Sequence, residues 1–113
     1  MALLRRRRSG GAAGGSAPAT GDGTRVRGME PAALAHLEQF VESRRGVEAY
    51  VEPPTTVSQM TVVLVAVDGE WTRRRIASGR DAGDLGRRLG IPVYDINATG
   101  YPPRMREWSA RQK

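Results

Sequence analysis

The sequence has no cysteine and a single histidine, His36, and these two shortages exclude much site chemistry. Without cysteine there are no disulfides, thiolate metal sites or cysteine nucleophiles. One histidine cannot build a histidine-rich zinc site and argues against a Ser–His triad. No phosphate-binding loop, dinucleotide fingerprint or paired-carboxylate motif is present either. We therefore expect no catalytic residues, no metal and no bound cofactor, and we interpret His36 as a surface side chain.

Long apolar runs are also missing. A membrane-spanning helix needs about 18 consecutive apolar residues, and no stretch of the chain comes close. Residues 1–8, MALLRRRR, resemble the start of an export signal, but the following Gly/Ala/Ser-rich stretch has no apolar core. We expect no membrane partner and a cytoplasmic location.

The net charge of +6 is concentrated at the N-terminus. Residues 1–28 hold six arginines against one aspartate, and residues 29–113 are nearly neutral. Residues 1–28 lack hydrophobic periodicity and cannot bury enough apolar surface to offset the entropy of ordering them. We predict a disordered basic tail over 1–28 and one small domain over 29–113. One interpretation of the tail is an inert extension, or a mis-assigned start with Met29 as the true first residue. The other is a basic arm for RNA, DNA or membrane, in which Arg5, Arg6, Arg7 and Arg8 would contact nucleic acid.

Hydrophobic periodicity predicts an α+β domain with the element order α-β-β-β-α-β-α. Its sheet is small and mainly antiparallel, with the helices packed on one side. A loop is expected over 95–100. The predicted elements are a helix over 31–45, strands over 47–51, 60–67 and 70–76, a helix over 78–89, a strand over 91–94 at a sheet edge and a helix over 104–111.

Asp68-Gly69 separates two strand-like runs and predicts a two-residue type I′ hairpin turn. With this turn Val65 pairs with Thr72. One face of the hairpin then carries Trp71, Arg73 and Arg75 together with Ala66, Leu64 and Val62.

The helix over 78–89 starts with Ser78 followed by Asp81, the spacing of a capping box. Gly83 and Gly86 each lower helix propensity by about 1 kcal/mol relative to alanine. We interpret the two glycines as marks of close packing on the sheet.

The first candidate binding surface is the strand that carries Trp71, Arg73 and Arg75. An aromatic ring interleaved with arginines can stack a base and hold phosphates. The alternative is an ordinary sheet face, with arginine stems covering apolar surface. In that case the arginines would pair with Glu48, Glu52 or Asp81.

The second candidate surface is the segment 94–108, which concentrates aromatic and arginine side chains around Pro-Pro. Such segments are typical of recognition surfaces, and Tyr101, Arg104 and Trp108 would make the contacts. The alternative is that Tyr94, Met105 and Trp108 simply complete a small core.

The runs VEPPTTVSQMTVVLVAVDGEWTRRR (51–75), LGIPVYD (89–95) and TGYPPRMREWSAR (99–111) resemble a family of short actinobacterial proteins. Members often carry the label "oxidoreductase". The resemblance covers roughly residues 47–111 and implies no catalytic residues. The sequence contains no flavin, nicotinamide or thiol motif that would support this label independently.

Taken alone, the sequence predicts a non-catalytic binding module that engages a protein partner through the sheet face and the C-terminal helix. One alternative is a small oxidoreductase or oxidoreductase accessory protein, with any cofactor held between subunits. The other is nucleic-acid binding through the basic tail.

Overall fold

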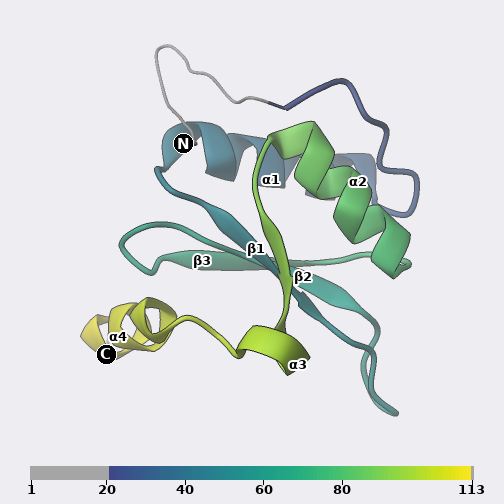
Figure 1. Ribbon diagram of the computed structural model, residues 1–113. Helices are drawn as coiled ribbons and strands as arrows, with labels where there is room; N and C mark the ends of the chain where they lie inside the picture. The colour runs from purple at the N-terminus through teal and green to yellow at the C-terminus, as the bar shows by residue number, and fades with distance from the viewer. Residues whose placement is uncertain (1–20, 113) are drawn as a thin grey trace.

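The computed structural model describes residues 21–112, so Arg5, Arg6, Arg7, Arg8 and most of the predicted tail lie outside the described residues. The described chain has the predicted α+β class and the predicted element order (Figure 1). It forms α1 (Pro31–Ser43), β1 (Glu48–Glu52), β2 (Thr61–Val65), β3 (Trp71–Arg75), α2 (Gly79–Leu89), β4 (Val93–Asp95), α3 (Ile96–Thr99) and α4 (Pro103–Arg111).

The short helix α3 stands where a loop was expected, so that expectation is wrong. The Asp95 side chain accepts a hydrogen bond from the Asn97 backbone N–H at 2.7 Å and thereby caps the single helical turn. A cap of this kind uses one aspartate, which hydrophobic periodicity does not detect.

The sheet has the strand order β3-β2-β1-β4. Its β1–β2 and β2–β3 pairs are antiparallel, and the β1–β4 pair is parallel. Strand β2 lies inside the sheet and is buried on both faces from Val62 to Val65, as its unbroken apolar run predicts. Strand β4 forms an edge directly after Pro92, which is where a strand can tolerate proline.

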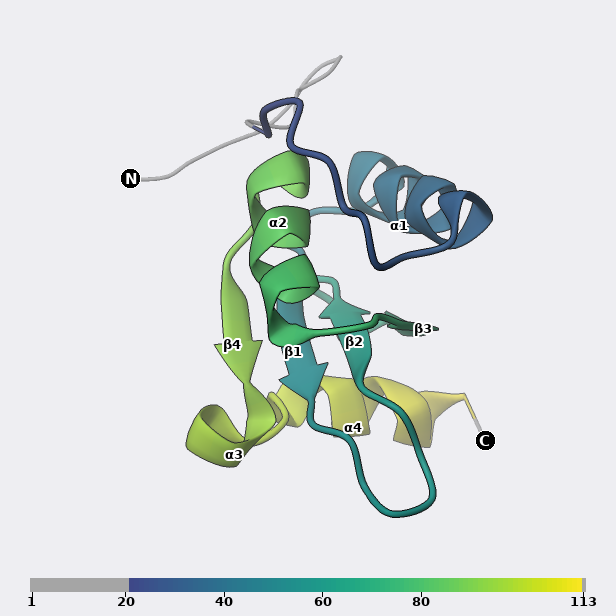
Figure 2. The ribbon, with the colours of Figure 1, turned by 90° about the vertical axis from the view of Figure 1, so that its right-hand side faces the viewer.

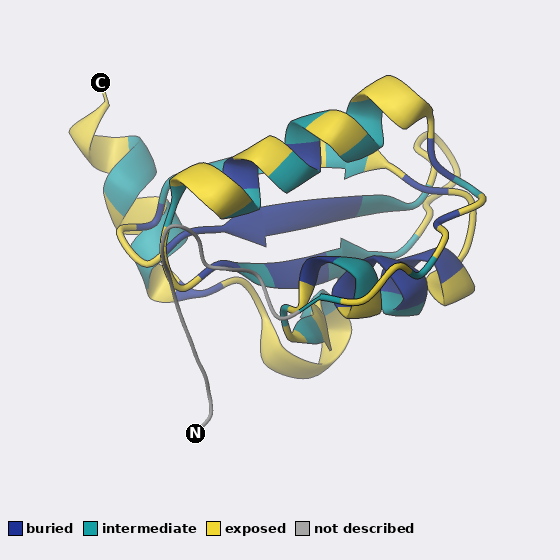
Figure 3. Cartoon of the chain, turned by 90° about the horizontal axis from the view of Figure 1, so that it is seen from above, coloured by how far each residue is buried: buried dark blue, intermediate teal, exposed yellow. Residues whose placement is uncertain are grey.

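Helices lie on both faces of the sheet, which corrects the expectation that they pack on one side. Helices α1 and α2 lie over one face, and α3 and α4 lie on the other (Figures 1 and 2). The reason is the composition of β2, because a strand that is apolar on both faces needs cover on both. Seen from above, the buried strands lie beneath helices whose outer surfaces are exposed (Figure 3).

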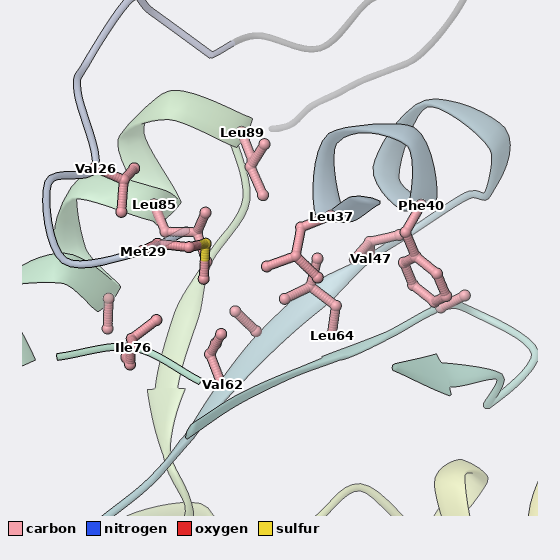
Figure 4. Close-up of a cluster of buried hydrophobic side chains, with 13 residues drawn as sticks. Val26, Met29, Leu37, Phe40, Val47, Val62, Leu64, Ile76, Leu85 and Leu89 are labelled. Atoms are coloured by element: carbon pink, nitrogen blue, oxygen red, sulfur yellow. The ribbon is translucent and has the colours of Figure 1, made fainter. Parts of the chain in front are cut away.

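The larger core lies between the sheet and helices α1 and α2 (Figure 4). Full burial of one leucine or valine side chain contributes roughly 1.5–3 kcal/mol, so this core is the main source of stability. Its side chains come from α1 (Leu37, Phe40), α2 (Ala82, Leu85, Leu89), the sheet (Ala49, Val62, Leu64), the connections next to the strands (Val47, Ala66, Ile76) and the N-terminal segment (Val26, Met29).

Residues 21–28, which the sequence assigned to the tail, pack on the domain. Val26 is 8% exposed within the larger core, and the Asp22 N–H donates to the Arg87 carbonyl at 3.0 Å. At the other end of the segment, the Gly28 carbonyl accepts from the Ala77 N–H at 3.0 Å. A domain boundary after residue 28 therefore does not fit this packing. A lone valine between two arginines has no periodicity that could predict burial.

The β2–β3 hairpin differs by one residue from the predicted register. Its turn has three residues, because the Ala66 N–H donates to the Glu70 carbonyl at 2.8 Å and Gly69 closes the turn with φ +97°. Val65 therefore lies opposite Trp71, and a slip of one residue moves side chains to the other face. The face shared by Trp71, Arg73 and Arg75 carries Val65, Val63 and Thr61, not Ala66, Leu64 and Val62.

The start of α2 is not a capping box. Ser78 makes no side-chain cap bond to the helix, and its hydroxyl instead donates to Asp81 Oδ2 at 3.0 Å. The other carboxylate oxygen of Asp81 accepts from the Gly28 N–H at 2.9 Å. Asp81 thus ties the N-terminal segment to α2.

Close packing of α2 on the sheet is confirmed for Gly86, where an added Cβ would lie 2.5 Å from Val93 Cγ2. It does not hold for Gly83, whose nearest such neighbour is Arg87 NH1 at 3.9 Å.

Candidate functional site

The sheet face under α4 carries most of the binding residues that the sequence predicted. Two of them, Arg73 and Tyr101, donate hydrogen bonds to Glu52. Arg73 donates through Nε and NH2 to the two Glu52 oxygens at 2.7 and 2.9 Å. The Thr61 hydroxyl donates to Oε1 at 2.5 Å, and the Tyr101 hydroxyl donates to Oε2. Arg73 and Tyr101 are therefore joined through one carboxylate.

The ionised form of the Glu52 carboxylate is strongly favoured over the protonated form. Burial raises its pKa, but the hydrogen bonds from Arg73, Thr61 and Tyr101 outweigh burial and lower the pKa to about 2. The carboxylate therefore stays ionised throughout the neutral range, and its role in the fold is that of a fixed acceptor.

Arg104 joins α4 to the sheet. Its Nε donates to the Ala66 carbonyl at 2.9 Å, and its NH2 donates to Glu48 Oε1 at 2.7 Å. The Tyr50 hydroxyl donates to the same Glu48 oxygen at 2.9 Å. Burial, followed by this contact with Glu48, raises the pKa of Tyr50 to about 12. Arg104 thus completes a polar contact at the edge of an otherwise apolar patch.

The two tryptophans also help to seat α4. Trp71 donates from Nε1 to the Ser109 hydroxyl at 3.0 Å, and the Arg73 guanidinium lies 5.1 Å from the centroid of its ring. Trp108 is half-buried beside the turn, where a Cβ on Gly69 would lie 2.8 Å from Trp108 Cβ.

These contacts agree with the structural interpretation of both surfaces, in which arginines pair with acids and aromatic residues complete a core. A second, smaller cluster of Tyr50, Val63 and Val65 packs with Met105 and Trp71. Tyr94 is an exception, because it remains 37% exposed and its ring lies 5.4 Å from that of Tyr50.

Arg75 behaves differently from the other nominated residues. It is exposed and lines an open groove of about 570 Å³ between the N-terminal segment and the end of β3. Arg25 and Arg27, both exposed, line the same groove. None of the three arginines is paired with a carboxylate within residues 21–112. The single acidic side chain among the lining residues is Glu30.

The Arg25–Val26–Arg27 segment explains how two charges reach the groove. Val26 is held in the core, and the arginines on either side of it are exposed. The hydrogen bonds of Gly28 to Asp81 and Ala77 then hold the segment against the end of β3. Sequence reasoning missed Arg25 and Arg27 because it placed both in the tail, where a single valine between two arginines gives no periodic signal of burial.

His36 is half-buried, so it is not the surface side chain that we expected. Its Nε2 lies 2.8 Å from the Thr72 hydroxyl. Burial, followed by the charges of Arg74 and Arg44, lowers its pKa. A histidine that activates a hydroxyl needs a group that orients its second nitrogen. No residue within 21–112 bonds to that nitrogen, and the contact with Thr72 joins α1 to β3.

Within residues 21–112, no group of three histidine or acidic side chains could hold a metal ion. In the same part of the chain, no helix is both long and apolar enough to cross a membrane. Comparisons with protein-family models, curated proteins and solved structures find no match to this chain.

Proposed function

We propose that the protein is a non-catalytic binding module of the cytoplasm that recognises an anionic partner through the groove of Arg25, Arg27 and Arg75. The observation that supports this proposal is the convergence on one groove of three exposed arginines from two distant segments, none of them paired with a carboxylate of residues 21–112. We refer to it below as the arginine groove.

Three like charges in one groove repel each other, and a bound anion would replace that repulsion with attraction. A guanidinium group presents planar N–H donors that match the oxygens of phosphate or carboxylate groups. The arginine groove therefore has the chemistry of an anion site, and its open form suits a group carried by a larger partner.

The proposal moves the binding surface away from the sheet face and C-terminal helix that the sequence favoured. On that face Arg73 and Arg104 are already bonded to Glu52 and Glu48. A partner that used them would have to replace these contacts. The oxidoreductase label of the similar family gains no support from any described contact, and it stays a prediction of the resemblance.

A thermal-shift screen of the full chain tests the proposal. The probes are heparin, polyglutamate, flavin mononucleotide and a nicotinamide dinucleotide. A probe present at about 100 times its dissociation constant adds about 2.7 kcal/mol, which raises the midpoint by several degrees. We expect shifts with polyanions that shrink in Arg75→Gln and persist in Arg106→Gln. Arg106 is the matched control because it is exposed on α4 and lines no part of the groove.

Two results would contradict the proposal. The first is the absence of a shift with either polyanion. The second is a shift with a flavin or nicotinamide probe alone that Arg75→Gln leaves unchanged, which would support the oxidoreductase label instead.

A further inference from the structure

Among its described lining residues the arginine groove exposes no large hydrophobic side chain. Val26, Met29 and Ile76 are 8%, 8% and 2% exposed and belong to the core, so the exposed apolar lining comes from the compact residues Pro31 and Ala77. Protein interfaces gain most of their affinity from large aromatic and apolar anchors seated in pockets. A protein partner would find no such anchor here, and charge would supply most of the affinity.

Aromatic side chains are also absent from the residues of the described chain that line the groove. Proteins that read single-stranded bases stack them on exposed rings. Trp71 is the nearest candidate in the sequence of β3, and its N–H is bonded to Ser109 under α4. The groove therefore has the means to hold phosphates and lacks the means to stack bases.

Positive charge recurs in the sequence before and within the groove segments. Arg25 and Arg27 come from one segment and Arg75 from another. The sequence that precedes them adds Arg5 to Arg8 and has no acidic residue before Asp22. A series of cations suits a ligand with a series of anions, and the phosphate backbone of nucleic acid is such a ligand.

From these observations, and resting on the proposed function, we infer that the anionic partner is a nucleic acid held by its phosphate backbone without sequence selectivity. The arginine groove supplies the contacts from the folded domain. Glu30 opposes them, because it places one carboxylate among the lining residues.

Fluorescence anisotropy with the full chain tests this inference. The probes are two labelled 20-nucleotide single strands of unrelated sequence, with unlabelled heparin and polyglutamate as competitors. We expect equal affinity for both strands and a fall of binding with salt. Each lost phosphate contact should reduce the slope of log affinity against log salt by about one.

A set of variants distinguishes binding at the arginine groove from a general effect of positive charge. We expect Arg75→Gln and the double variant Arg25→Gln/Arg27→Gln to weaken binding several-fold more than Arg106→Gln, which removes a charge elsewhere. Glu30→Gln should strengthen binding, because it removes the only carboxylate among the described residues that line the groove. A variant with all of Arg5 to Arg8 changed to glutamine measures the share of affinity that comes from the preceding segment.

The possible failures are distinguishable. If heparin or polyglutamate binds with the same dependence on Arg75 but neither strand binds, the nucleic-acid inference is wrong and the proposed function stands. If no polyanion binds, or if Arg106→Gln weakens binding as much as Arg75→Gln, both are wrong. If binding is lost only when Arg5 to Arg8 are replaced, the groove is not the site.

Discussion

Two arginines on the same face of β3 have opposite surroundings. Arg73 donates two hydrogen bonds to Glu52, and Arg75 has no carboxylate partner within the described residues. In the sheet register Thr61 lies between Glu52 and Arg75, but the Glu52 carboxylate is bonded by Thr61 and, diagonally, by Arg73. The same residue type therefore serves the fold at one position and is free for a ligand two residues later.

The comparison extends to the whole molecule. On the α4 side, Arg73 and Arg104 hold the C-terminal segment on the sheet through Glu52 and Glu48. In the arginine groove, Arg25, Arg27 and Arg75 form no ion pair with a described residue. Variants on the α4 side should change stability, and variants in the groove should change binding.

The largest effect is expected for Gly69→Ala. Gly69 has φ +97°, which costs alanine roughly 1–2 kcal/mol, and an added Cβ would overlap the Arg104 carbonyl on α4. We expect a loss of more than about 3 kcal/mol in the free energy of unfolding, measured by denaturant titration. Binding at the groove should persist below the melting temperature, because no described residue of α4 lines the groove.

The control for this variant is Gly79→Ala. No atom lies within 4 Å of the added Cβ at this position, so the free energy of unfolding should change by less than about 1 kcal/mol. Equal losses in the two variants would show that the turn does not position α4 as described.

A smaller effect is expected for Arg104→Ala. The substitution removes the charge-assisted hydrogen bonds to Glu48 and to the carbonyl of buried Ala66, which keeps only the Gly69 N–H as a donor, and we expect a cost of about 2 kcal/mol of stability. Arg75→Ala is the matched comparison and should stay within about 0.5 kcal/mol. The denaturant midpoints of the two variants, measured in parallel, test this difference. Similar losses of stability would mean that arginines on the α4 side and in the groove do not differ in their contribution to the fold.

The smallest effect concerns acid stability. The pKa of Glu52 is lowered from 4.5 to about 2 in the folded state, so its stabilisation is present above pH 4.5 and is lost as the pH falls towards 2. Arg73 is 42% exposed, and with solvent screening we expect a loss of about 1–2 kcal/mol across this window.

Denaturant titrations at several pH values measure this loss in the wild type and in Glu52→Gln. The variant should be less stable at neutral pH and show a shallower fall in acid. An identical acid slope in the two proteins would mean that Glu52 does not carry the charge-dependent contacts of the α4 face.

The sequence predicted the helices and strands well where periodicity is strong, as in α1 and β2. It failed at the hairpin, because Asp68-Gly69 fits both a two-residue turn and a three-residue turn with glycine at the positive-φ position. This difference of one residue in turn length decides which side chains of β2 lie on the same face as Trp71, Arg73 and Arg75. Turn length is set by the hydrogen bonds of Ala66, which the sequence does not display.

For the site, the sequence identified arginine and aromatic positions but not which of them already had partners. Glu52 comes 21 residues before Arg73 in the chain, so their contact depends on the strand order. Arg75 could be named from the strand alone. Arg25 and Arg27 could not, because their place in the groove depends on Asp81, which accepts from Gly28 at a distance of 53 residues.

The attachment of residues 21–28 has a consequence for the motions of the protein. Ordering one residue costs roughly 1–2 kcal/mol of backbone entropy, and this segment is held by Val26, a few hydrogen bonds and no helix or strand. We expect it to open by local unfolding more readily than β3, which belongs to the sheet. A ligand that bridges both sides of the groove would then close it, and backbone amides such as Gly28 N–H would exchange with solvent more slowly when the ligand is bound.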